Sequence, residues 1–289
     1  MKFLAAHGVE FCCDSRKGPG IAGILNLSPD SFSGDGKMDM ESRFAMIQKS
    51  GASFVDVGAE STRPGSQPVP EEMEIKMIRD ALRFIRSRSD LPVSVDTRKS
   101  AVAEMALNEG ADIINDVSGL QYDPAMADVI AAHGAGLILM HSRGTPETMQ
   151  SAEHLQYNNV CEDVSRFFHE QLAYAESRGI RSDHIMLDPG IGFAKTQEQN
   201  LELIRYGAAF RKEFQLPVLY GVSRKRFLGE LTGQTDPAKR DFATAGVLAY
   251  LAVHGGVDFF RVHDPVGMNE MLKLYYILLS ENKQEGVKI

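Results

Sequence analysis

Cysteine is scarce in this chain of 289 residues, and its cysteines lack the spacing of a metal or redox motif. Cys12, Cys13 and Cys161 form no CxxC pair and are odd in number, which favours free thiols in a reducing cytosol over a disulfide framework. Residues 1–6 are too short an apolar stretch for a signal-peptide core, and no run reaches the roughly 18 apolar residues of a membrane helix. We therefore expect a soluble, cytoplasmic protein without a membrane partner.

Positive charge is also in deficit, because the chain has 31 Lys and Arg residues but 39 Asp and Glu residues, for a net charge of −8. A nucleic-acid-binding surface needs a basic excess, so nucleic acid is not an expected partner. The HExxH pattern of zinc hydrolases and the GxSxG pattern of serine hydrolases are missing, which disfavours both kinds of site. No stretch is polar or repetitive enough to be disordered.

A repeated pattern dominates what is present: eight times, a short apolar run ends on a polar residue that could take part in chemistry. Such runs between amphipathic segments are typical of buried parallel strands, and eight strand–helix units close a (β/α)8 TIM barrel of about 250 residues. The carboxyl ends of all strands then meet at one mouth, where active sites lie. The expected strands are residues 21–26, 54–56, 93–96, 113–116, 137–141, 185–188, 218–223 and 259–263. The polar residues expected to converge are Asn26, Asp56, Asp96, Asn115, His141, Asp188, Ser223 and His263.

Between these runs, apolar residues recur at the spacing typical of helices. The helix-to-strand turns are tight, whereas the strand-to-helix loops 27–38 and 59–69 are long, as in a barrel whose mouth carries mobile loops. Pro124, Pro237 and Pro265 each follow an aspartate, which is expected at the start of a helix. The expected helices are residues 40–50, 70–87, 99–108, 124–133, 152–177, 197–214, 237–254 and 265–279.

The organisation indicates one domain over residues 1–289, since no linker is visible. The first twenty residues could form a small hairpin across the closed end of the barrel. A doubly wound open sheet is the structural alternative, but eight evenly spaced units suit closure better. The segment "GPGIAG" (18–23) matches GxGxxG formally, yet it precedes a strand instead of following one, so it is not a dinucleotide-binding turn.

Several motifs at the expected strand ends indicate function as well as fold. They are "NLSPDSFSGDG" (26–36), "GAESTRPGS" (58–66), "IINDVSG" (113–119), "LDPGIGFAKT" (187–196), "GVSRKRFLG" (221–229) and "RVHD" (261–264), together with Asp96. In this order, over about residues 20–280, they closely resemble the dihydropteroate synthases, a family of pterin-binding TIM barrels. The resemblance implies that 6-hydroxymethyl-7,8-dihydropterin diphosphate condenses with 4-aminobenzoate to 7,8-dihydropteroate and diphosphate, in folate biosynthesis.

Carboxylates in a barrel mouth suit the donor edge of a pterin, because a buried carboxylate accepts two charge-assisted hydrogen bonds from it. By resemblance Asp188 takes this role, Asn115 supports it, and Lys225 donates to the carbonyl side of the ring. Asp96 would face the carbon that becomes cationic. Arg261 would stack on the pterin, and we count it with Asp96 and Lys225 among the catalytic residues.

Arg261 and His263 alternate on the last strand and so share one face, and an inward arginine is costly to bury without an anion. By resemblance both meet the diphosphate together with Asn26, and these three are catalytic and diphosphate-binding candidates. Asn26 is also the candidate metal ligand, since Mg²⁺ keeps several waters and binds substrate phosphate, so one protein ligand suffices. Mg²⁺ is therefore the expected cofactor.

Ser223 ends a strand and precedes residues 224–228, which could begin a helix, so a hydroxyl and helical N–H groups could bind a carboxylate. By resemblance this carboxylate belongs to 4-aminobenzoate. The resemblance also assigns the aromatic slot to five further residues: Phe32, Thr62, Arg63, Pro64 and Phe193. The family's first loop usually reads "PDSFSDGG", whereas this one reads "PDSFSGDG", so no role is carried onto Asp35.

Two other functions stay open on the sequence. A methyltetrahydrofolate methyltransferase shares the pterin-binding barrel, but it needs neither a diphosphate site nor an arylamine slot. A non-catalytic pterin-binding paralogue would be marked by loss of Asn26, Asp96 or Lys225, and all three are present. His141 has no evident base or nucleophile beside it and is expected to be structural, and Glu60 is expected to belong to a loop or a cap. The family implies a homodimer.

Overall fold

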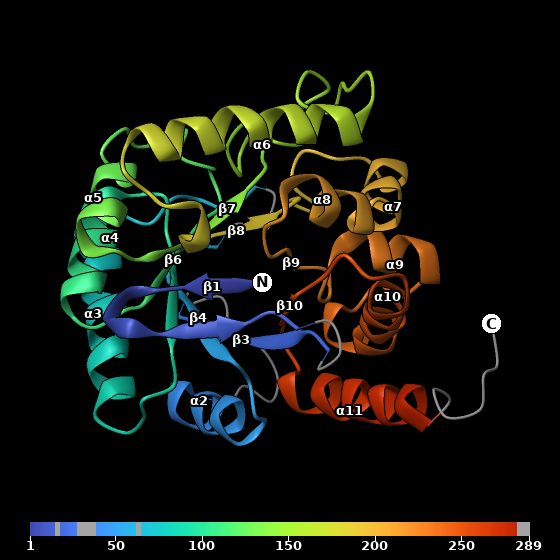
Figure 1. Ribbon diagram of the computed structural model, residues 1–289, viewed down its shortest axis with the longest axis horizontal. Helices are drawn as coiled ribbons and strands as arrows, with labels where there is room; N and C mark the ends of the chain where they lie inside the picture. Colours follow the sequence, from blue (N-terminus) through green and yellow to red (C-terminus); the bar gives the residue numbers. More distant parts are fainter. Residues whose placement is uncertain (15–17, 28–38, 62–64, 282–289) are drawn as a thin grey trace.

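A ring of eight parallel strands forms the centre of the computed structural model, which describes residues 1–14, 18–27, 39–61 and 65–281 (Figure 1). Neighbouring strands pair in the order β8-β7-β6-β5-β4-β3-β10-β9. The ring closes where the Leu187 N–H donates to the Pro217 carbonyl at 2.9 Å and Leu187 bridges Val218 in parallel. The predicted (β/α)8 barrel is confirmed, and the open sheet is excluded. The strands are β3 (Gly20–Asn26), β4 (Phe54–Gly58), β5 (Val93–Asp96), β6 (Ile113–Asp116), β7 (Gly136–Met140), β8 (Ile185–Asp188), β9 (Leu219–Tyr220) and β10 (Phe259–Val262).

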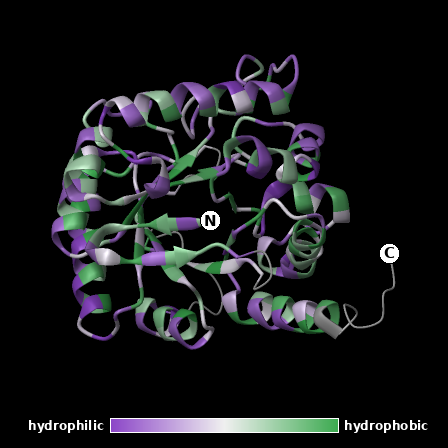
Figure 2. Ribbon diagram, in the orientation of Figure 1, coloured by the Kyte–Doolittle hydropathy of each residue, from purple (hydrophilic) through white to green (hydrophobic). Residues whose placement is uncertain are grey.

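The strands are apolar along their length because both of their faces are buried. Side chains on one face fill the barrel, and those on the other pack beneath the helices. Gly23 on β3 shows how close this packing is, since a Cβ there would lie 2.6 Å from the side chain of Ile47 on helix α2. Figure 2 shows the same layering, with largely hydrophobic strands inside a ring of helices that mix hydrophobic and hydrophilic residues.

Helices follow the strands around the outside of the barrel (Figure 1). Asp123, Asp236 and Asp264 accept hydrogen bonds from backbone N–H groups two or three residues further on, so Asp264 caps its helix as predicted, whereas Asp123 and Asp236 cap short turns that precede their helices. The helices are α2 (Met40–Lys49), α3 (Glu71–Arg86), α4 (Ser100–Asn108), α5 (Met126–His133), α6 (Val160–Ser177), α7 (Gln197–Arg205), α8 (Gly207–Phe214), α9 (Arg226–Thr232), α10 (Asp241–His254) and α11 (Pro265–Glu281), with short 3₁₀ turns η1 (Ala6–Gly8), η2 (Ser182–His184) and η3 (Pro237–Lys239).

Three helix boundaries differ from the prediction for local reasons. Helix α6 begins at Val160 rather than at residue 152, because Asn159 caps it with its side-chain oxygen. The predicted helix 197–214 is broken at Tyr206 into α7 and α8. Only a glycine fits at position 207, where a Cβ would lie 2.9 Å from the Tyr220 hydroxyl. Residues 237–239 form the 3₁₀ turn η3 before α10 begins.

The N-terminal hairpin closes the lower end of the barrel, as predicted. Strands β1 (Lys2–Leu4) and β2 (Glu10–Cys12) pair antiparallel, with Phe3 opposite Phe11. The Phe11 ring lies 5.7 Å from the Phe54 ring and 5.6 Å from the Phe259 ring, centroid to centroid, and both of these residues begin barrel strands. The hairpin therefore covers the amino ends of the strands and leaves their carboxyl ends for chemistry.

All three cysteines lie in the described part of the chain and are unpaired there. Burial raises the pKa of Cys13 to about 12 and that of Cys161 to about 11, so these two thiols are inert near neutral pH. Within the described ranges, no helix is both long enough and apolar enough to cross a bilayer.

Candidate active site

Register places three predicted site residues, together with Gly58, in one row across the barrel mouth. Asn26 on β3 lies opposite Gly58 on β4, Gly58 lies opposite Asp96 on β5, and Asp96 lies opposite Asn115 on β6. Gly58 keeps this row tight, since a Cβ there would lie 3.3 Å from Asp96 Cβ. Residues that are far apart in the sequence therefore meet because their strands end at the same level.

Arg261 on β10 reaches across this mouth to two carboxylates. Its Nε donates to Asp56 Oδ2 at 2.5 Å, and its Nη2 donates to Asp96 Oδ2 at 2.9 Å. The sequence correctly placed Arg261 inside the mouth but expected its anion to be the diphosphate. Asp56 was expected to converge on the mouth but was given no role, and the structure adds it to the site as a buried partner of the arginine.

One guanidinium shared by two buried carboxylates cannot neutralise both of them. Burial, together with the negative charge of Asp56, raises the pKa of Asp96 to about 8 against the opposing effect of Arg261. Burial disfavours the charged form of Arg261, but Asp56 and Asp96 outweigh it, so the pKa of Arg261 is raised. Near neutral pH the mouth thus holds a charged arginine and a proton on Asp96.

Asn115 contributes an unused acceptor to the same region. Its Nδ2 lies 3.4 Å from each carboxylate oxygen of Asp56, which fixes the orientation of the amide because the opposite orientation would set oxygen against oxygen. Its Oδ1 is buried and has no hydrogen-bond partner within the described residues. A buried acceptor of this kind is costly unless a donor reaches it, which points to a ligand.

Asp188 and Lys225 face the mouth from its other side. Asp188 Oδ1 accepts the Gly190 N–H at 2.7 Å. Burial raises the pKa of Asp188, and the positive charge of Lys225 partly offsets this effect. Burial likewise lowers the pKa of Lys225 to about 8, against the effect of Asp188. Each group keeps its charge more readily when the other is charged, so the two act as a pair across the site.

Ser223 and His263 meet at the carboxyl ends of adjacent strands. The backbone N–H of His263 donates to Ser223 Oγ at 3.1 Å, and His263 Nδ1 lies 3.1 Å from the same oxygen. The resemblance assigned these residues to different substrates, and the structure brings the predicted arylamine and diphosphate regions into contact. Arg43 on α2, which sequence reasoning missed, adds a cation close by and donates to the carbonyl of His263 at 2.5 Å.

Phe193 belongs to the turn that follows β8, and its ring centroid lies 4.5 Å from Lys225 Nζ. Lys225 Nζ also donates to the carbonyl of Ile191 in this turn. The predicted aromatic slot is therefore described only in part, by Phe193 and Ser223. Its other members and the shifted loop acid lie outside the described residues; they are Phe32, Asp35, Thr62, Arg63 and Pro64.

His141 has a partner that sequence reasoning did not find. Lys195 Nζ lies 3.0 Å from His141 Nδ1, and both side chains are buried. Burial lowers the pKa of His141 well below its ordinary value, and Lys195 adds to this effect. The position of Lys195 in "DPGIGFAKT" was the available signal, but nothing in that motif showed which strand the lysine would reach.

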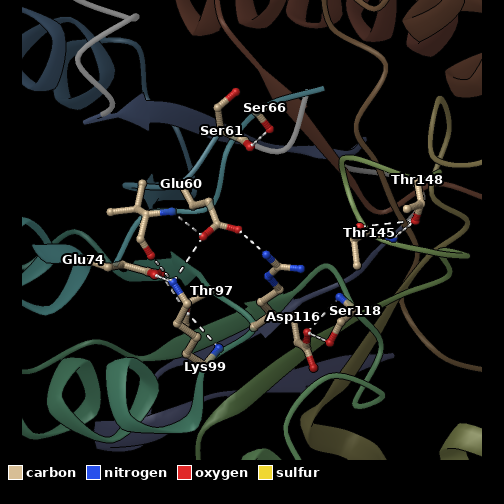
Figure 3. Close-up of polar contacts among 12 residues, drawn as sticks. Glu60, Ser61, Ser66, Glu74, Thr97, Lys99, Asp116, Ser118, Thr145 and Thr148 are labelled. Carbon is tan, nitrogen blue, oxygen red and sulfur yellow. Dashed lines mark hydrogen bonds and ion pairs between the residues drawn. The ribbon is translucent and has the colours of Figure 1, made fainter. Parts of the chain in front are cut away.

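Glu60 holds together the two ends of the loop between β4 and α3, as Figure 3 shows. Its Oε1 lies 2.9 Å from Arg98 Nη2, and its Oε2 accepts from the Val69 N–H at 3.1 Å and from Lys99 Nζ at 3.2 Å. Lys99 Nζ also donates to the Val69 carbonyl at 2.7 Å and to Glu74 Oε2 at 2.5 Å. Glu60 thus belongs to a loop, as predicted, and its contacts join the two ends of that loop.

A metal ion would find few protein ligands at this mouth. Within the described ranges, no group of three His, Cys, Asp or Glu side chains is placed to hold one. Asn26 offers a single neutral amide oxygen at the end of β3. This donor set fits Mg²⁺ that arrives on a substrate phosphate and keeps most of its waters, rather than a permanently bound ion.

A cavity of about 500 Å³ lies at the opposite end of the barrel, between the N-terminal hairpin and the start of β10. Its arginine, Arg211, is already paired with Asp258, with Nε 3.0 Å from Oδ2. The strand-end residues described above are absent from the lining of this cavity. The chemistry therefore belongs to the mouth despite the size of the lower cavity.

Known proteins resemble this chain in both sequence and structure. A sequence model described as pterin binding enzyme matches residues 22–263. The dihydropteroate synthase of Synechocystis sp. is 39% identical over 259 residues, which cover 88% of each protein. The crystal structure of Yersinia pestis dihydropteroate synthase with a sulfonamide drug has a TM-score of 0.87 and 32% identity over 97% of this chain and 100% of that one. The Xanthomonas albilineans dihydropteroate synthase with 4-aminobenzoic acid has a TM-score of 0.85 and 33% identity over 96% and 98%.

Proposed function

We propose that this chain, which belongs to the pterin-binding enzyme family, catalyses the dihydropteroate synthase reaction. In this reaction 6-hydroxymethyl-7,8-dihydropterin diphosphate is joined to 4-aminobenzoate, and diphosphate is released. The observation that carries the proposal is the meeting of Asp96, Asp188 and Arg261 at one barrel mouth. Relatives named for this activity match most of the chain, and one of them was solved with 4-aminobenzoic acid.

The pterin would bind between Asp188 and Asn115. The carboxylate of Asp188 accepts two hydrogen bonds from the amine and ring N–H of the pterin, and Asn115 Oδ1 gains a donor, which none of the described residues supplies. Lys225 donates to the ring carbonyl. With a pKa near 8, this lysine is largely protonated at neutral pH, and binding beside a carboxylate keeps it so.

Asp96 would face the carbon from which diphosphate departs. The expected mechanism is dissociative, so positive charge builds up on this carbon before the arylamine attacks. A growing cation favours the carboxylate form of Asp96, whose pKa is raised by burial in the free protein. Arg261 stays paired with Asp56 on its other side, which holds the guanidinium in place beside the pterin.

The diphosphate would lie between Arg261, His263 and Asn26, with Arg43 behind His263. Mg²⁺ would be held by the Asn26 amide oxygen and by phosphate oxygens of the substrate, and when bound it supplies positive charge for the leaving group. The protein side chains then orient the diphosphate away from the pterin carbon. The arylamine is already unprotonated near neutral pH, so the site needs no strong base.

The arylamine would lie against Phe193, with its carboxylate at Ser223. Helix α9, which follows Ser223, has only 7 residues, so the hydroxyl carries more of this interaction than the helix does. Phe32, Thr62, Arg63 and Pro64 complete the slot in the proposal. Water must be kept from the cation while the arylamine approaches, and the two long loops at the mouth are the segments expected to cover it.

The chain would act as a cytoplasmic homodimer. Exposed apolar side chains lie on the outer surfaces of α10 and α11, and Phe242 is 93% exposed. A patch of this kind favours association with a second copy. Sedimentation of wild type and of a Phe242→Ser, Leu274→Ser double variant tests this, and a monomeric wild type would contradict it. The other exposed apolar residues on these helices include Tyr250, Val253 and Leu278.

Turnover by the purified chain tests the main proposal. With both substrates and Mg²⁺, diphosphate and dihydropteroate should form in equal amounts, and the omission of either substrate should stop both. A methyltransferase would instead demethylate methyltetrahydrofolate. A non-catalytic paralogue would bind the pterin and release no diphosphate.

A further inference from the structure

The turn that follows β8 has a backbone that needs support. Gly190 and Gly192 have φ values of 68° and 82°, and Ala194 has a φ of 49°, which is unfavourable for a residue with a side chain. A Cβ at position 190 would lie 1.9 Å from the carbonyl oxygen of His141, so the turn packs directly on the backbone of the neighbouring strand end. Such a conformation persists only when its surroundings fix it.

Lys195 provides this support from inside the turn. Its side chain is 4% exposed, and Nζ donates to the Gly190 carbonyl at 3.0 Å and to the Phe193 carbonyl at 2.9 Å. The third contact is His141 Nδ1 at 3.0 Å. An ammonium would donate to all three atoms, and a neutral amine would donate to both carbonyls and accept from the imidazole. In either state every hydrogen-bonding position of the amine is used within the protein.

The turn after β8 also determines where two substrate-facing groups lie. Ile191 accepts a hydrogen bond from Lys225, the Phe193 ring covers the same ammonium, and a Cβ at Gly192 would lie 3.0 Å from Lys225 Cδ. Both Lys225 and Phe193 thus pack against the segment that Lys195 ties to His141. A displacement of about 1 Å in such groups can cost about a hundredfold in rate.

We propose that Lys195 is a positioning residue that locks the 189–195 turn onto His141 and so sets the places of Phe193 and Lys225 for the arylamine and the pterin. This inference rests on the proposed function, because that function gives Phe193 and Lys225 their substrates. Lys195 itself touches neither substrate. A merely structural lysine would contribute stability without affecting the balance between KM and kcat.

Lys195→Met tests the proposal, because it keeps the length of the side chain and removes its hydrogen bonds. We expect the KM for 4-aminobenzoate to rise at least about tenfold and kcat to fall less. The matched control is Arg211→Met, which removes a half-buried cation from Asp258 at the other end of the barrel. It should lower Tm and leave both KM values unchanged. An unchanged KM in Lys195→Met, or an equal rise in Arg211→Met, would overturn the proposal.

Hydrogen exchange of the ligand-free proteins provides a second measurement that does not depend on turnover. Lys195→Met should lose amide protection in residues 189–195, while β8 stays protected. Unchanged exchange in the turn counts against Lys195 even if the wild type proves inactive. A wild type that turns over nothing while the turn loosens as expected would overturn the proposed function instead.

Variants at His141 keep the test available if Lys195→Met does not fold. His141→Asn retains an acceptor near the Nδ1 position, whereas His141→Phe does not. The Asn variant should therefore keep a KM for 4-aminobenzoate close to that of the wild type, and the Phe variant should raise it as Lys195→Met does. Equal KM values in the two variants would contradict the link between Lys195 and His141.

Discussion

Arg261 on β10 donates a hydrogen bond to Asp96 on β5 at 2.9 Å, although 165 positions separate them in the sequence and two strands separate them in the barrel. The same guanidinium binds Asp56 on β4. Two buried carboxylates therefore depend on one cation, and the charge that the cation cannot balance is removed by protonation. This arrangement links the stability of the mouth to pH.

Asp96→Asn should become relatively more stable as the pH rises. The pKa of Asp96 is raised from an unfolded value of about 3.9 to about 8, so the folded protein keeps a proton that the unfolded chain loses. The stability contributed by this proton is fully present below the unfolded pKa and is lost as the pH rises through about 8. The variant does not titrate here, so its Tm relative to wild type should increase from about pH 5 to about pH 8.

Thermal unfolding at these pH values, with Asp80→Asn as control, measures the difference. Asp80 is an exposed carboxylate on α3, and the Tm difference between Asp80→Asn and the wild type should not change with pH. A Tm difference for Asp96→Asn that stays constant from about pH 5 to about pH 8 would show that Asp96 is already ionised in the folded protein. Turnover by Asp96→Asn should fall at every pH, because the carboxylate that faces the cation is gone.

Arg261→Met should destabilise the protein strongly near neutral pH, because Asp56 and Asp96 would remain buried without their cation. Breaking a buried ion pair from one side typically costs about 3–5 kcal/mol. Addition of Asp56→Asn to this variant should recover part of the loss, since one of the two carboxyl groups that are buried without the cation disappears. Chemical denaturation of the wild type, single and double variants would measure this, and additive losses would contradict a shared arginine.

The sequence was sufficient for the strands, their order and the rim on which the chemistry lies, because runs such as 113–116 are continuous and end on polar residues. The partner of Arg261 was not predictable, since register alone decides that Asp56 and Asp96 point at one guanidinium. The contact of Lys195 with His141 depends on a turn with three positive φ values, which no periodicity reveals. Helix α6 starts late for a similarly local reason, the cap at Asn159.

Pterin binding should depend on Asp188 and Lys225 more than the fold does. Asp188→Ala and Lys225→Ala should each lose about 2–5 kcal/mol of pterin binding free energy, since each removes one side of a buried charge-assisted contact. Asp188→Asn is the useful comparison, because it retains an acceptor for the Gly190 N–H but no carboxylate for the pterin. Calorimetry that finds wild-type affinity in Asp188→Ala would remove Asp188 from the site.

The contacts of Lys99 predict a stability effect without a direct effect on the pterin. Lys99→Met should leave Glu60 and Glu74 without their common cation, and it should weaken the link between the two ends of the loop between β4 and α3, because the Val69 carbonyl also loses its donor (Figure 3). We expect a loss of about 3–5 kcal/mol, in the range for one-sided removal of a buried pair. Lys76→Met, which breaks an exposed pair with Asp80, should cost less than about 1 kcal/mol. Equal losses in urea denaturation would contradict the role of Lys99.

The substrates should bind in order, with pterin diphosphate before 4-aminobenzoate. The proposed slot draws on both long loops of the mouth, and diphosphate with Mg²⁺ is expected to bring those loops to it. In calorimetry, 4-aminobenzoate should therefore bind measurably only after pterin or diphosphate has been added together with Mg²⁺. Equal affinity for 4-aminobenzoate with and without diphosphate would show that the slot does not depend on the diphosphate site.

Sulfonamides should compete with 4-aminobenzoate, because they share its shape and its arylamine, and the Yersinia pestis relative was solved with such a drug. Pro64→Leu, at a position outside the described residues, should weaken the inhibitor more than the substrate, since the sulfonyl substituent extends further toward the mouth. A difference of about 1.4 kcal/mol corresponds to roughly tenfold resistance. Phe193→Ala is the matched comparison, because its ring would contact the arylamine part that both ligands share. Steady-state inhibition should show that Pro64→Leu loses affinity mainly for the sulfonamide, whereas Phe193→Ala loses affinity equally for the sulfonamide and for 4-aminobenzoate. Equal losses for the two ligands in both variants would mean that Pro64 does not border the sulfonyl substituent.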